Sequence, residues 1–111
     1  MISNEGLIEL EGNWNNTVTS NPLSPGTGEV DLVGTDQILG GNFNSVFNLL
    51  SLRNNQTVTL GTTVGIEDQL DLGDGTLVLD SNTLRIINPA NSAIVNNTGG
   101  IFAETLSLIH I

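Results

Sequence analysis

The stretch that decides the fold is residues 57–86, which read TVTLGTTVGIEDQLDLGDGTLVLDSNTLRI. Apolar and polar residues alternate in its short runs, as they do in a strand that buries one face. Glycine, aspartate and asparagine stand between the runs, and these residues favour tight turns. The stretch therefore predicts several short strands that are joined by turns.

The same pattern recurs along the whole chain with a step of 19–24 residues. Three apolar series share this step, and a series of Asn and Asp residues marks turns at the same interval. The apolar series are Leu10, Leu32, Leu52, Leu72 and Ile94; Val18, Ile38, Val58, Leu77 or Leu79, and Ile101; and Phe47, Ile66 and Ile86. The turn series is Asn16, Asp36, Asn55, Asp74 and Asn97.

Three apolar series with one period indicate three strands in each repeat. We therefore predict an all-β fold, a right-handed parallel β-helix of about four coils that is incomplete at both ends. Stacked coils would place like residues above like, so each series would form a buried ladder. An antiparallel β-sandwich is the alternative, because it also has a strand about every 8–12 residues. A sandwich, however, does not need three series that share one period.

The composition supports a folded β protein. Leu, Ile, Val and Phe make up 37 of 111 residues, which is well above the level of a disordered chain. Asn, Thr, Gly and Ser make up 48 residues and alanine only 3, a balance that disfavours helix and favours strands and turns.

The charge balance excludes several classes of function. The chain has 2 basic and 12 acidic residues, a formal net charge of −10, and no cysteine. It cannot form the basic surface that nucleic acids or anionic lipids require. It has neither thiolate ligands nor a cysteine nucleophile, and no apolar run approaches the roughly 20 residues that span a bilayer. We therefore expect neither a nucleic-acid partner nor membrane insertion.

The two ends of the sequence suggest a fragment. The first residues have no basic segment and no apolar core, so they do not form a signal peptide. Either the protein is intracellular or its true N-terminus is missing. Residues 106–111, LSLIHI, are the literal translation of CTG TCT CTT ATA CAC ATC, which resembles the transposon end of sequencing-library adapters. We therefore interpret residues 1–105 as a β-solenoid fragment and residues 106–111 as an adapter-derived tail. The alternative is that 106–111 form a genuine apolar strand.

The order of three stretches resembles a repeat module of large secreted cell-surface proteins of Bacteroidota. The stretches are GLIELEGNWNN (6–16), GTGEVDLVGTDQILGGNFNSVFNLLSL (26–52) and VTLGTTVGIEDQLDLGDGTLVLDSNTLRIINP (58–89), and the resemblance covers about residues 3–105. It implies an adhesin-like or stalk segment that is exported by type IX secretion and lies outside the cell or on its outer surface. It implies flanking repeats of the same longer chain as partners, and it implies no catalytic residues.

The segment around Asp71 and Asp74 is a candidate calcium site. The two carboxylates stand three residues apart among glycines, and such turns can offer calcium both carboxylate and carbonyl oxygens. The spacing matches neither the EF-hand nor the nonapeptide calcium repeat. A solvated turn is therefore the alternative, and Ca²⁺ is the one candidate ion; no other cofactor is expected.

Trp14 is a candidate glycan contact, because an exposed indole can stack on a sugar. The alternative is that it packs on the end of the first strand. Carboxylates at Glu9, Glu11, Glu29 and Asp31 raise the further alternative of glycoside hydrolysis. A β-helical enzyme, however, also needs a groove lined by basic or aromatic residues, and few are present. The single histidine, His110, lies in the suspected tail.

These observations predict no enzyme. The sequence favours a non-catalytic structural or adhesive segment of a secreted or cell-surface bacterial protein. Extracellular glycans or surfaces are further candidate partners. The alternative is a fragment of a carbohydrate-binding or carbohydrate-active β-helix protein.

Overall fold

A computed structural model describes residues 2–3, 6–17, 23–24, 28–88, 93–96, 98–103 and 108–110. Within these residues the regular structure is β, with no α-helix, and the strand pairs are parallel. The chain forms a parallel β-solenoid of about four turns. The predicted β-helix is thus confirmed, and the sandwich is excluded because its strands pair antiparallel.

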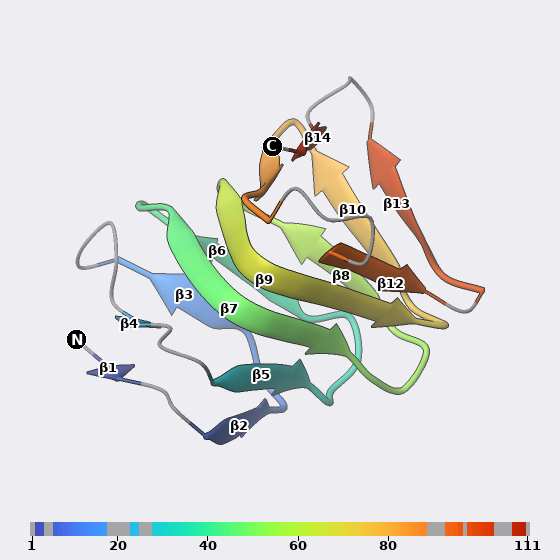
Figure 1. The fold of residues 1–111 in the computed structure, drawn as a ribbon, viewed down its shortest axis with the longest axis horizontal. Coiled ribbons are helices and arrows are strands. Elements are labelled where there is room, and N and C mark those ends of the chain that lie inside the picture. The colour runs from blue at the N-terminus through green and yellow to red at the C-terminus, as the bar shows by residue number, and fades with distance from the viewer. Residues whose placement is uncertain are drawn as a thin grey trace.

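The strands follow one another in stacked coils, which together make about four turns and which we number from one to five along the chain (Figure 1). The first coil holds β1 (Ile2–Ser3), β2 (Leu7–Leu10) and β3 (Trp14–Asn16), and the second holds β4 (Leu23–Ser24), β5 (Glu29–Leu32) and β6 (Ile38–Gly41). The third holds β7 (Ser45–Leu52) and β8 (Thr57–Leu60), and the fourth holds β9 (Val64–Gly73) and β10 (Thr76–Asp80). The fifth holds β11 (Leu84–Ile86), β12 (Ile94–Asn96) and β13 (Gly100–Ala103), and β14 (Leu108–His110) follows it.

The strands form three parallel sheets: a two-stranded sheet of β1 and β4, and two larger sheets that enclose the core. The five-stranded sheet has the order β13-β10-β8-β6-β3, and the seven-stranded sheet has the order β14-β11-β9-β7-β5-β2, with β12 also paired to β9. The long strands β7 and β9 are strongly curved (Figure 1). The first part of β9 pairs with β11 and its last part with β12, so one strand supplies two sides of its coil. Each coil therefore has three sides, as the three series predict.

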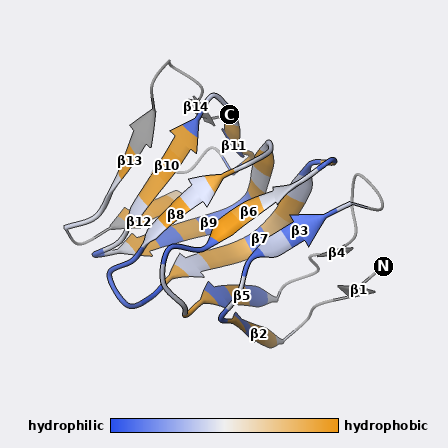
Figure 2. Cartoon of the chain, turned by 180° about the vertical axis from the view of Figure 1, so that it is seen from behind, coloured by the Kyte–Doolittle hydropathy of each residue, from blue (hydrophilic) through white to orange (hydrophobic). Residues whose placement is uncertain are grey.

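Stacked aliphatic side chains fill the space between the sheets, and Figure 2 shows the apolar residues concentrated in the strands. The third predicted series is confirmed residue by residue, because Phe47 pairs with Ile66 and Ile66 with Ile86. All three are fully buried. Each such side chain contributes about 1.5–3 kcal/mol through its removal from water.

The second series is right in three coils and wrong in a fourth. Val58, Leu77 and Ile101 stand in register, as predicted. Ile38, however, pairs with Thr59 and is 43% exposed, whereas its neighbour Leu39 is buried. A shift of one residue moves a strand side chain to the opposite face. Here Gln37 and Leu39 are the buried residues, so Ile38 between them faces outward. Val18 lies outside the described residues.

The first series is confirmed through Leu10, Leu32 and Leu52, which stand in register. Its last member is displaced, because Ile94 pairs with Leu70 rather than with Leu72. The reason is a longer connection in the fifth coil. Eight positions separate Ile86 from Ile94, against four between the matching residues Ile66 and Leu70.

The turn series holds in the second, third and fourth coils. Asp36 and Asn55 have left-handed φ angles of 51° and 53°, as expected of turn residues. In the fourth coil Asp74 lies in the turn, and its neighbour Gly73, with φ of 56°, takes the left-handed conformation. Asn16 is wrong as a turn residue, because it is a buried strand residue opposite Gly41. Asn97 lies outside the described residues.

Part of the suspected tail forms a strand. Leu108, Ile109 and His110 pair in parallel with β11, while residues 106, 107 and 111 lie outside the described residues. The adapter origin of residues 106–111 stays a prediction. In the part of the chain that the structure describes, no helix has the length and apolar character needed to cross a membrane.

Candidate functional site: a carboxylate cluster around Arg53

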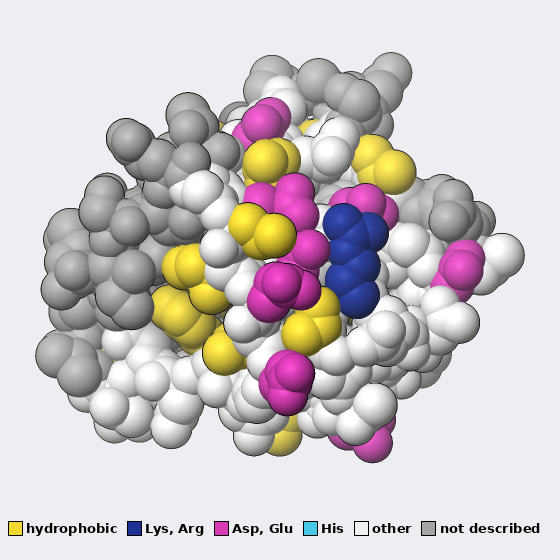
Figure 3. Space-filling view, turned by 90° about the horizontal axis from the view of Figure 1, so that it is seen from below, with side chains coloured by type: hydrophobic (Ala, Val, Ile, Leu, Met, Phe, Trp, Pro, Cys, Tyr) yellow, Lys and Arg dark blue, Asp and Glu magenta, His cyan; other side chains and the backbone are white. Residues whose placement is uncertain are grey.

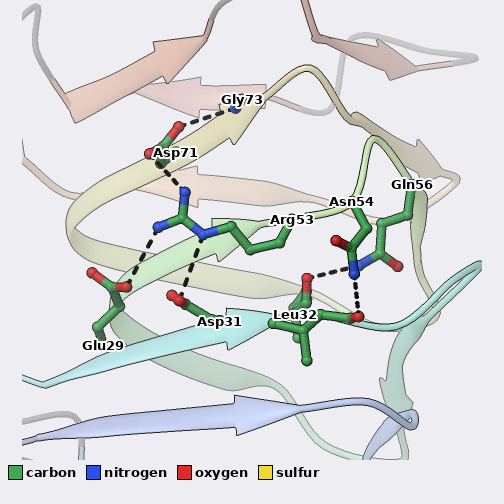
Figure 4. A network of polar contacts seen from close by, with 9 residues as sticks. Glu29, Asp31, Leu32, Arg53, Asn54, Gln56, Asp71 and Gly73 are labelled. Carbon is green, nitrogen blue, oxygen red and sulfur yellow. Dashed lines mark hydrogen bonds and ion pairs between the residues drawn. The ribbon is translucent and has the colours of Figure 1, made fainter.

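The main group of charged side chains lies on the outer surface of the seven-stranded sheet. Asp31 on β5, Ser51 on β7 and Asp71 on β9 stand in register on three successive coils. Arg53 follows Ser51 by two residues, and its guanidinium group lies between the carboxylates of the coils on either side (Figure 4). We call Glu29, Asp31, Arg53 and Asp71 the Arg53 cluster.

Arg53 makes three ion pairs within this cluster. Its Nε lies 3.5 Å from Asp31 Oδ2, its Nη2 lies 3.8 Å from Glu29 Oε2, and its Nη1 lies 3.9 Å from Asp71 Oδ2. The Arg53 side chain is 45% exposed, and Figure 3 shows acidic side chains gathered beside basic ones on this face. One cation thus links the second, third and fourth coils, and three carboxylates share it.

Glu29 and Asp31 form a close carboxyl pair. A hydrogen bond to Asp31 raises the pKa of Glu29, partial burial and the negative charge of Asp31 raise it further, and Arg53 lowers it. Asp31 is only 8% exposed, and its Oδ1 is buried without a hydrogen-bond partner. Buried polar atoms are normally paired, so this oxygen is the one feature of the cluster that the ion pairs leave unexplained.

The structure gives the two calcium candidates separate roles. Asp71 Oδ1 accepts a hydrogen bond of 3.0 Å from the Gly73 amide, which stabilises the turn after β9. Asp74 Oδ1 accepts hydrogen bonds from the amide and hydroxyl of Thr98 in the next coil, at 3.2 and 2.9 Å. Among the described residues, no group of three or more His, Cys, Asp and Glu side chains could hold a metal ion. The calcium site stays a prediction.

Trp14 contacts the core of the first coils. Its indole N–H donates a hydrogen bond of 2.9 Å to Ser45 Oγ, and its ring meets Phe47 edge to face with 5.4 Å between centroids. Trp14 pairs with the buried Leu39 and is half-buried. The ring is therefore packed, with these contacts on β7, and the glycan contact stays a prediction.

The carboxylates considered for acid–base chemistry are only partly brought together. Glu9 and Asp31 stand opposite each other on the outer surface, as expected from the repeat. Glu29 joins them through the Arg53 cluster, whereas Glu11 lies beyond the end of β2 and is exposed. The side chain of His110 lies outside the described residues. Three carboxylates and one guanidinium group thus form an ion-pair network that spans three coils.

Sequence reasoning missed a second group of polar contacts. Gln37 and Gln56 are buried where the chain turns from the seven-stranded to the five-stranded sheet. Gln56 Nε2 donates to Gln37 Oε1 and to the Leu32 carbonyl, both at 2.8 Å. Gln56 Oε1 accepts from the backbone N–H of Gln37 at 3.3 Å. Gln37 Nε2 donates to the carbonyls of Leu10 and Gly12.

We call Gln37, Gln56 and the neighbouring Gly34 the amide corner. The Gly34 amide donates to Gln37 Oε1 at 2.8 Å. Through the hydrogen bonds of Gln37 to Leu10 and Gly12 and of Gln56 to Gln37, the corner joins the first three coils. The two glutamines stand 19 residues apart, which is the period of the repeat. This spacing is the signal that could have found them.

Comparison with protein-family models, with curated proteins and with solved structures gives no match. The resemblance to Bacteroidota surface proteins therefore stays a prediction.

Proposed function

We propose that the chain is a non-catalytic structural or adhesive segment of a secreted or cell-surface bacterial protein. The observation that carries the proposal is the unequal burial of the core ladders. Val30, Leu50 and Leu70 of the middle coils are at most 1% exposed. Ile8 in the first coil and Ile94 in the fifth, which belong to the same ladder, are only half-buried.

The edges of the sheets support the same proposal. Within the described residues, β1, β2 and β3 of the first coil each stand at the end of a sheet. An unpaired parallel edge with half-buried aliphatic residues favours another coil as its neighbour. We therefore propose flanking coils of the same kind as partners. The acidic, lysine-free composition and the resemblance support a location outside the cell or on its surface.

The carbohydrate alternative draws less support. Trp14 is the aromatic side chain that it relies on, and the indole ring contacts Phe47 rather than standing free. Extracellular glycans therefore remain candidate partners only if the chain acts as an adhesive segment.

Sedimentation equilibrium of the 111-residue chain tests the coil-stacking core of this proposal. We expect reversible, concentration-dependent association, and we expect Ile8→Lys to weaken it because the ammonium group would face the apolar end of the stack. Thr57→Lys, at an exposed site on the five-stranded sheet, is the matched control and should leave association unchanged. A monodisperse monomer at all concentrations would contradict the proposal, as would equal effects of the two substitutions.

A further inference from the structure

We propose that Glu29 and Asp31 hold one proton between them, and that this proton makes the Arg53 cluster a pH-sensitive latch between the second, third and fourth coils. The charge balance of the Arg53 cluster is the first observation behind this proposal. Three carboxylates surround one guanidinium group, so the ionised cluster carries an excess of two negative charges. A single proton on the carboxyl pair removes half of this excess.

The unpaired Oδ1 atom of Asp31 is a second observation in favour of this shared proton. Asp31 Oδ2 faces Arg53 Nε, while Oδ1 is buried and has no donor. An unpaired buried acceptor costs about 1–3 kcal/mol, more when it is charged. A protonated Glu29 carboxyl is a donor beside this group, and the hydrogen bond between the two side chains is the largest cause of the raised pKa of Glu29.

The other charged neighbours keep the proton on this pair. Glu29 and Asp31 lie on β5; Arg53 and Asp71 approach from the third and fourth coils, and Glu9 on β2 stands opposite Asp31. Arg53 favours ionised carboxylates, whereas Asp71 and Glu9 oppose a further negative charge. A carboxylate thus approaches the pair from each side of β5, Glu9 on the adjacent β2 and Asp71 on β9 beyond β7, and only the β7 side also brings a cation.

The sign of the pH effect follows from the raised pKa. Because the folded chain holds the Glu29 proton more tightly than the unfolded chain, this contribution to stability is complete below the ordinary glutamate pKa of about 4.3. It is lost as the pH rises through the raised pKa of Glu29. The latch is therefore closed in mildly acidic surroundings and weaker at neutral pH.

Carboxyl ¹³C NMR titration of the folded 111-residue chain tests the shared proton directly. We expect the midpoint of Glu29 to lie above the ordinary glutamate value. In Asp31→Asn the midpoint should fall, because the amide cannot share the proton as a carboxylate does. An unchanged midpoint in that variant would overturn the proposal.

Thermal unfolding of Glu29→Gln tests the latch independently, because its neutral amide imitates the protonated carboxyl. At pH 7 we expect a Tm roughly 1–3 °C above that of the wild type, the size of a solvent-screened charge effect. The difference should vanish near pH 4. Glu67→Gln removes one negative charge from an exposed site outside the cluster and is the matched control. Equal Tm shifts for the two variants at pH 7 would refute the latch.

Discussion

The amide corner and the Arg53 cluster join neighbouring coils by opposite means. In the amide corner, Gln37 and Gln56 are at most 5% exposed and bond through short, neutral hydrogen bonds. In the Arg53 cluster, a half-exposed guanidinium group meets carboxylates at 3.5–3.9 Å. Buried amides are costly to leave unpaired, whereas exposed ion pairs contribute little. The difference teaches that the amide corner carries stability and that the Arg53 cluster can respond to solution conditions.

The largest expected effect comes from Gly34→Ala in the amide corner. A Cβ atom at Gly34 would overlap the Glu11 carbonyl oxygen and lie 3.2 Å from Gln37 Cδ. Because backbone must move to make room, we expect a loss of at least about 3 kcal/mol, or a Tm roughly 10 °C lower. Gly12→Ala is the matched control, since a Cβ there meets nothing within 4 Å. Similar Tm values for the two variants would contradict the close packing of the corner.

A smaller loss is expected for Gln56→Leu. The substitution removes the acceptor of the Gln37 backbone N–H. The Leu32 carbonyl still accepts from the Arg53 backbone N–H at 2.9 Å. One unpaired buried N–H costs about 1–3 kcal/mol, measurable by urea unfolding. A double-mutant cycle with Gln37→Leu isolates the contact between the two side chains. Strictly additive losses would mean that the glutamines do not act as a pair.

The smallest effect is expected for Arg53→Gln. Exposed ion pairs are worth about 0–1 kcal/mol, and salt screens them. We therefore expect a slight loss of stability at low ionic strength that disappears in about 1 M NaCl. Urea unfolding at the two salt concentrations measures it. A loss larger than that of Gln56→Leu would reverse the ranking of the two regions.

The periodic apolar residues predicted the fold because burial acts on every coil in the same way. Phe47, Ile66 and Ile86 repeat at 19 and 20 residues, and the structure stacks them in register. The prediction for Ile38 was wrong because the polar residue before it, Gln37, is buried in its place. Hydrogen bonds of the Gln37 side-chain amide compensate there for the missing apolar contact. Hydrophobicity alone could not assign that strand to its face.

The polar contacts were harder to predict than the core. Nothing near Arg53 in the sequence indicates its partners, since Asp31 precedes it by 22 residues and Asp71 follows by 18. The partners become visible only once Asp31, Ser51 and Asp71 are known to stand in register. For Trp14 the sequence allowed both an exposed and a packed side chain. Only the structure, which places Phe47 beside the indole ring, distinguishes the two.

The parallel stacking of the coils also determines how the stack bears load. Each repeat of about 20 residues lengthens the stack by only about 4.8 Å, so the chain gains reach at roughly 0.2 Å per residue. The backbone hydrogen bonds between coils run along this axis. A pull along this axis therefore puts the full force on the hydrogen bonds between every pair of coils, whereas a sideways push is shared by the closely packed ladders within.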